Sequence, residues 1–100
     1  MWILLLNQSN KIIAKHKISQ GGISATTVDI RIIMKYTLEI LASGLILCHN
    51  HPSGNKSPSK DDTVLTNKIR ESAKTIDVQL LDHIIVANDS YYSYADDGLL

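Results

Sequence analysis

The sequence has one cysteine, no formal net charge and no long hydrophobic run, and each of these absences excludes a class of protein. A single cysteine, Cys48, cannot form an internal disulfide, so a disulfide-stapled domain is excluded and the chain is compatible with a reducing compartment. Ten Lys and Arg residues balance ten Asp and Glu residues. This balance argues against strong sequence-independent binding to nucleic acid, although a local basic patch remains compatible with it.

The apolar start MWILLL is too short for a membrane span and lacks the basic segment of a signal peptide, so we expect a strand there and no membrane partner. The length of 100 residues predicts one small domain, 1–100, and 44% apolar residues are typical of a globular fold. A domain that opens directly on a strand fits either a short member of a longer family or a part of a longer protein.

The periodicity of the apolar residues predicts the order β-β-α-β-α-β-β, and therefore an α/β fold with a mixed sheet and helices packed against it. Glycines in SQGGIS, residues 19–24, indicate a turn or bulge before the first helix. The buried stripe of that helix is expected to include Leu38 and Leu41, and Gly44 is expected to end it. The expected elements are strands 2–7 and 11–19, a helix over Asp29–Ser43, a strand over 45–48, a helix from Ser59, and a hairpin of 78–87 with 91–95.

The stretch HNHPSGNKSPSKDD concentrates groups that bind cations. His49 and His51 are separated by one residue, so in an extended strand both side chains leave the same face of the sheet. Pro52 takes the chain out of the sheet, and Gly54 allows a sharp turn. Asp62, in the first turn of the following helix, can then close a His-His-Asp triangle.

Imidazole nitrogens and a carboxylate suit zinc, and three protein ligands leave a fourth position for water, as is typical of catalytic zinc. Such an ion lowers the pKa of its water to about 7. Ser59 has two compatible interpretations. It is an N-cap, with Asp62 completing a capping box, and it is a donor to an oxyanion that develops beside the metal.

These residues resemble the JAMM metalloprotease signature, which reads His-x-His, seven residues, Ser, two residues, Asp; His49, His51, Ser59 and Asp62 match it without a gap. HNHPSG, LLDHIIV and YYSYADDGLL further resemble the RadC family of bacterial proteins, and the similarity covers nearly the whole chain. The resemblance implies a cytidine-deaminase-like, three-layer α/β/α fold, as in the JAB/MPN domain. It also implies a zinc ion held by His49, His51 and Asp62, catalytic assistance from Ser59, and a location in the bacterial cytoplasm.

In JAMM enzymes the zinc site cleaves peptide or isopeptide bonds, and a glutamate upstream of the histidines acts as the general base. RadC relatives are expected to carry it in a segment resembling VxPRE, but the corresponding run here is VDIRII, so Ile32 stands at its position. Isoleucine cannot take a proton, and the loss of a base costs about 10²–10⁴-fold in rate. Two other acidic residues are candidates for the base. Asp29 lies one turn earlier and has a shorter reach, and Glu39 is expected on a solvated face. A base from outside this chain is a further alternative.

Three hypotheses follow. The first is a zinc-dependent hydrolase of the RadC type, a family with a historical DNA-repair label. The second is a non-catalytic binding module associated with DNA processing that keeps the metal for folding, and the third is a nucleic-acid binder or nuclease, although the zero net charge argues against nucleic-acid binding. His83 is expected on the opposite face from Asp82, in a structural role or supporting the ligands rather than as a ligand. Cys48 is expected in the core, facing away from both histidines, and His16 on a sheet face. The cluster of Tyr91, Tyr92 and Tyr94 is expected to pack or to line an edge rather than to stack on bases.

Overall fold

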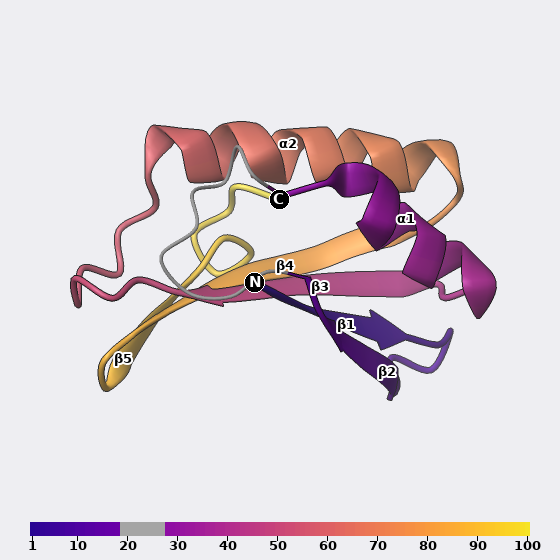
Figure 1. Cartoon of the computed structure of the whole chain (residues 1–100), viewed down its shortest axis with the longest axis horizontal. Coiled ribbons are helices and arrows are strands. Elements are labelled where there is room, and N and C mark those ends of the chain that lie inside the picture. The colour runs from indigo at the N-terminus through magenta and orange to yellow at the C-terminus, as the bar shows by residue number, and fades with distance from the viewer. Residues whose placement is uncertain (19–27) are drawn as a thin grey trace.

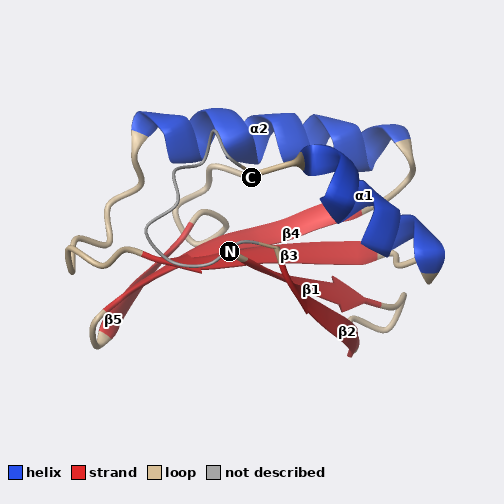
Figure 2. Ribbon diagram, in the orientation of Figure 1, coloured by secondary structure: helices blue, strands red, loops and turns tan. Residues whose placement is uncertain are grey.

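A mixed five-stranded sheet forms one layer of this computed structural model, which describes residues 1–18 and 28–100 (Figures 1 and 2). The order β-β-α-β-α-β-β and the α/β fold class predicted from the sequence are confirmed. The predicted turn or bulge at 19–24 lies outside the described residues. The elements are β1 (Trp2–Leu6), β2 (Ile12–Lys17), α1 (Ile30–Glu39), β3 (Gly44–Asn50), α2 (Lys60–Thr75), β4 (Gln79–Ala87) and β5 (Ser90–Ser93).

The strand order β2-β1-β3-β4-β5 contains one parallel pair, β3 with β4, and antiparallel pairs elsewhere. Neighbouring parallel strands need a crossover connection, and α2 supplies it. The crossover returns the chain from the end of β3, so the first turn of α2 begins near the carboxyl end of that strand (Figure 1). This placement brings residues 49–51 and the start of α2 together.

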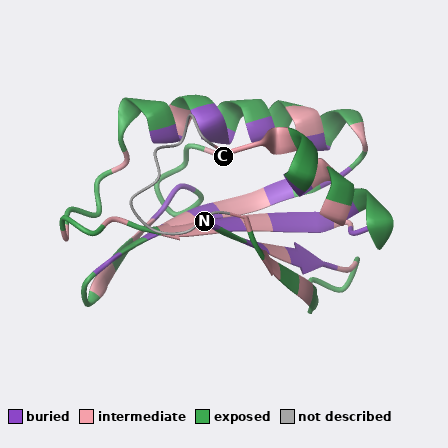
Figure 3. Ribbon diagram, viewed as in Figure 1, coloured by how far each residue is buried: buried purple, intermediate pink, exposed green. Residues whose placement is uncertain are grey.

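Both helices lie on the same face of the sheet, and the main core fills the space between the two layers (Figures 1 and 3). Alternate residues of β1 and β3 point into this core, as period-two alternation requires. The resemblance implied three layers; the described residues form two of them, the sheet and one helical layer. The fully buried core residues include Ile3, Leu5, Ile33, Leu45, Leu47 and Ile69.

The first helix is shorter than predicted, because it ends at Glu39 rather than at Ser43. Leu41 takes a left-handed conformation with φ of 49°, and the N–H of Ala42 donates to the carbonyl of Thr37, which closes the helix end. Leu41 is therefore 80% exposed and is not part of the buried stripe, and Leu38 is also exposed. Gly44 begins β3 instead, where a Cβ would lie 2.9 Å from Cδ1 of Leu81.

The other strands follow the prediction with small changes of boundary. β3 continues to Asn50, beyond the predicted end at Cys48, and β5 covers Ser90–Ser93 rather than 91–95. His16 lies on the helix-facing side of β2 and stacks on Tyr36 of α1, with ring centroids 3.8 Å apart, so the predicted sheet-face position is confirmed.

Among the described residues, neither helix combines the length and apolar character needed to cross a bilayer.

Candidate metal centre

The extended backbone at the end of β3 directs both histidines of the His-x-His pair to the helix-covered face. His49 belongs to β3, and the N–H of His51 donates to the carbonyl of Val86 at 2.9 Å, which carries the pairing with β4 one residue further. Because the chain remains extended, the two imidazoles emerge on the same side and meet. Gly54 then has φ of 80°, so the sharp turn predicted at this glycine is confirmed.

Asp62 is fixed by the capping box at the start of α2. Its N–H donates to Oγ of Ser59 at 3.0 Å, and its Oδ2 accepts from the N–H of Ser59 at 2.8 Å. The predicted capping role of Ser59 is thereby confirmed, whereas its role in catalysis stays a prediction. The positive end of the helix dipole favours a carboxylate in this turn. Asp62 is only 5% exposed, so this carboxylate points into the protein.

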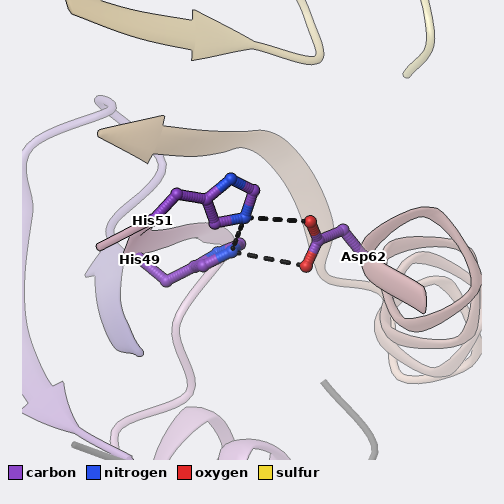
Figure 4. Close-up of side chains that lie close together, drawn as sticks. All are labelled: His49, His51 and Asp62. Carbon is purple, nitrogen blue, oxygen red and sulfur yellow. Dashed lines mark hydrogen bonds and ion pairs between the residues drawn. The ribbon is translucent and has the colours of Figure 1, made fainter. Parts of the chain in front are cut away.

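Three side chains converge at this point, as Figure 4 shows. Nε2 of His49 lies 3.1 Å from Nε2 of His51, and Nε2 of His51 lies 3.1 Å from Oδ2 of Asp62. Nε2 of His49 lies 3.3 Å from Oδ1 of Asp62, which closes the triangle. Each residue offers one ligand atom, and these atoms all lie within 4.8 Å of one another, close enough to share one ion.

The hydrogen bond of His51 to the backbone fixes which of its two nitrogens carries the proton when the ring is neutral. Nδ1 of His51 lies 2.7 Å from the carbonyl oxygen of Asn55, and a carbonyl can only accept. The proton of a neutral His51 is therefore on Nδ1, and Nε2 is bare. In this neutral form a bare nitrogen lies 3.1 Å from Oδ2 of Asp62, so two lone pairs face each other. A cation between them relieves this repulsion, so the donor set fits a metal ion.

Burial and charge set the protonation of these groups at neutral pH. Burial lowers the pKa of His49 below 6.5, despite the opposing attraction of Asp62. Burial opposes ionisation of Asp62, but hydrogen bonds from Ser59 and the two histidines outweigh it and lower the pKa of this carboxyl below 3.8. His49 is therefore neutral and Asp62 ionised, which are the forms that bind a metal.

The structure brings no second carboxylate into the triangle among the described residues. Ile32 lies on α1 with 42% of its side chain exposed. Asp29 caps α1 and binds Arg31 at 2.9 Å, so its carboxylate is already engaged. Glu39 pairs with Lys35 at 3.5 Å on an exposed face, as predicted.

His83 and Thr66 lie next to the triangle and make contacts that the sequence did not predict. Asp82 and His83 do lie on opposite faces: Asp82 accepts from the hydroxyl of Ser93 at 2.6 Å, while Nε2 of His83 lies 2.8 Å from Nδ1 of His49. Thr66, which lies 2.6 Å from His83, was missed by sequence reasoning. The available signal was its position four residues after Asp62, on the same face of the helix.

The remaining candidates lie outside the triangle. Cys48 alternates with His49 along β3, as predicted, but it is half-buried rather than part of the core. Burial raises the pKa of its thiol, in keeping with a packed residue rather than a thiolate ligand. Tyr94 is buried and stacks on His83, with Tyr92 edge-on to it, which confirms packing for two of the three tyrosines. Tyr91 is 60% exposed.

Comparison with known proteins agrees with the motif and with the geometry. The sequence model of the RadC-like JAB domain matches residues 1–99. The chain is 50% identical over 98 residues to the UPF0758 protein of Flavobacterium johnsoniae, covering 98% of this chain and 43% of that protein. It is 48% identical over 101 residues to the UPF0758 protein of Porphyromonas gingivalis, covering 100% and 44%. The chain thus spans less than half the length of these curated relatives.

Proposed function

Because this chain belongs to the RadC-like JAB domain family, we propose that it is a zinc-binding domain of the metallopeptidase type, acting on peptide or isopeptide bonds. The observation that carries the proposal is the convergence of His49, His51 and Asp62, whose ligand atoms all lie within 4.8 Å of one another. Two nitrogens and one carboxylate match the ligands of catalytic zinc sites with three protein ligands. The bacterial relatives and the single cysteine support a location in the bacterial cytoplasm.

A bound zinc ion supplies Lewis-acid activation of water and of a substrate carbonyl at neutral pH. The residues of this chain hold and orient the groups around that chemistry. His51 is fixed by its bond to the carbonyl of Asn55, and Asp62 is fixed by the capping box. Oγ of Ser59 accepts from the N–H of Asp62, which leaves the hydroxyl proton free to donate to an oxyanion that develops on the substrate.

The absence of a glutamate at residue 32 gives a direct test of hydrolysis. We expect Ile32→Glu to raise kcat/KM on peptide or isopeptide substrates by about 10²-fold or more, because the resemblance to JAMM enzymes implies the general base at this position. Residue 32 is 42% exposed, so the substitution should leave the fold intact. The measurement is hydrolysis of fluorogenic peptide and isopeptide substrates by zinc-loaded protein.

Ile32→Gln is the matched control, since glutamine has the size of glutamate but takes no proton at neutral pH. A gain in Ile32→Glu that is absent in Ile32→Gln supports a site that lost its base. Equal, baseline rates in the parent and both variants would count against hydrolysis through this position.

The identity of Ile32 also supports a second candidate, a metal-stabilised binding module associated with DNA processing. In that case zinc contributes to folding while no peptide, isopeptide or ester substrate is turned over. A chelator should then lower the melting temperature, while no turnover is measured with or without zinc. A salt-titrated DNA-binding assay tests the nucleic-acid hypothesis, and no affinity at low salt would dismiss it.

A further inference from the structure

A row of buried hydrogen bonds runs behind the triangle, from α2 through β4 to β3. Oγ1 of Thr66 lies 2.6 Å from the carbonyl oxygen of Asp62 and 2.6 Å from Nδ1 of His83. Nε2 of His83 lies 2.8 Å from Nδ1 of His49. Thr66 is 1% exposed and His83 is fully buried, so water does not compete for these bonds. Each member of the row therefore depends on its neighbours for its hydrogen-bond partner.

The carbonyl of Asp62 sets the direction of every proton in this row. A carbonyl oxygen only accepts, so a hydroxyl held 2.6 Å from it must donate its single proton there. The oxygen of Thr66 then accepts from Nδ1–H of His83. With its proton on Nδ1, a neutral His83 has a bare Nε2, which accepts from Nδ1–H of His49. The proton of His49 is thus on Nδ1, and its Nε2 faces the triangle with a lone pair.

Packing around His83 keeps its ring in the orientation that this row requires. The ring of Tyr94 stacks on it with centroids 5.1 Å apart and planes within 8°. The hydroxyl of Tyr94 is in turn hydrogen-bonded to that of Thr63 on α2 at 3.0 Å. His83 is therefore held between α2 and the end of the hairpin. This packing keeps Nδ1 of its ring toward Thr66 and Nε2 toward His49.

We propose that His83 and Thr66 are positioning residues that hold His49 in the tautomer with a bare Nε2, so that the metal-binding nitrogen exists before the ion arrives. This inference rests on the proposed function, since it concerns the same triangle. His83 and Thr66 are not among the three candidate ligands and act through His49. Partners behind metal-ligating histidines typically change metal affinity by about 10–100-fold when they are removed.

Loss of the Thr66 hydroxyl should reverse the donor and acceptor roles in the hydrogen bond between His83 and His49. Without an acceptor, Nδ1–H of His83 would be a buried donor with no partner, which is costly. Moving the proton of His83 to Nε2 avoids that cost and makes His83 the donor to Nδ1 of His49. The proton of His49 then lies on Nε2, 3.3 Å from Oδ1 of Asp62, where it competes with the metal.

The test compares Thr66→Val, which keeps the shape of the side chain, with Thr66→Ser, which keeps the hydroxyl. We expect Thr66→Val to weaken Zn²⁺ binding about 10–100-fold in a competition titration with a zinc chelator, and Thr66→Ser to bind within about threefold of the parent. Unchanged affinity in Thr66→Val overturns the proposal. An equal loss in both variants also overturns it, because packing rather than the hydroxyl would then be responsible.

The second measurement uses the metal-free parent and the metal-free Thr66→Val variant. Long-range ¹H–¹⁵N correlation spectra of the histidine rings should show His49 protonated on Nδ1 and bare on Nε2, and Thr66→Val should shift it toward the opposite tautomer. A parent His49 protonated on Nε2 overturns the proposal. A parent that binds no Zn²⁺ refutes the proposed function, whereas these spectra still decide the arrangement of the protons.

Discussion

Zinc should raise the melting temperature of the metal-free protein by about 10–20 °C, and Asp62→Asn should abolish most of that rise. A ligand that binds only the folded state stabilises it by about 2.7 kcal/mol when its free concentration is a hundred times Kd. For a domain of this size, each kcal/mol moves the melting temperature by about 4–8 °C. Asparagine keeps the shape of Asp62 and an oxygen for the capping box, but it removes the charge that faces His49 and His51.

The measurement is a thermal melt followed by circular dichroism, with added zinc and with chelator. Asp61→Asn is the matched control, because Asp61 lies in the same first turn of α2 but is exposed and outside the triangle. We expect this control to keep the full zinc-dependent rise. No shift in the parent, or an equal shift in Asp62→Asn, would contradict the site.

Acid should destabilise the metal-free protein well before its carboxylates titrate, because of His83. Burial above all, with the nearby His49, lowers the pKa of His83 from 6.5 to about 3. Below pH 6.5 the unfolded chain binds a proton at this residue, and the folded protein does not do so until about pH 3. The free energy of unfolding therefore decreases as the pH falls through this window, by about 1.4 kcal/mol per pH unit.

Between about pH 6.5 and 4.5 this residue alone should remove about 2–3 kcal/mol, a large part of the stability of a small domain. Urea denaturation of chelator-treated protein at several pH values measures the loss. His83→Gln cannot titrate, so its stability should depend much less on pH across the same window; the lowered pKa of His49 still contributes in both proteins. A parent whose stability is constant from pH 6.5 to 4.5 would contradict the neutral, buried state of His83.

The sequence predicts the triangle because its signals are local. Period-two alternation places His49 and His51 on one side of a strand, and the capping box places Asp62 in the first turn of a helix. The sequence also predicts the sharp turn at Gly54 between these two pieces. The parallel pairing of β3 with β4, which places the start of α2 near the end of β3, is seen only in the structure.

Two features could not be read from the sequence because they depend on tertiary packing. The first is the end of α1, where Leu41 takes a left-handed conformation that glycine adopts more easily. Gly44, which the sequence suggested as the end of the helix, instead lies in β3 in close contact with Leu81. The contact of Thr66 with His83 joins residues that lie on different elements, and neither residue type alone indicates it.

The most direct test of the account is the zinc content of the protein, purified without a polyhistidine tag and measured by elemental analysis. We expect close to one zinc per chain in the parent and almost none in His51→Ala. His16→Ala removes a histidine that stacks on Tyr36 outside the triangle, and it should keep the zinc of the parent. Equal zinc in His51→Ala and the parent would contradict the proposal that these three side chains hold one ion.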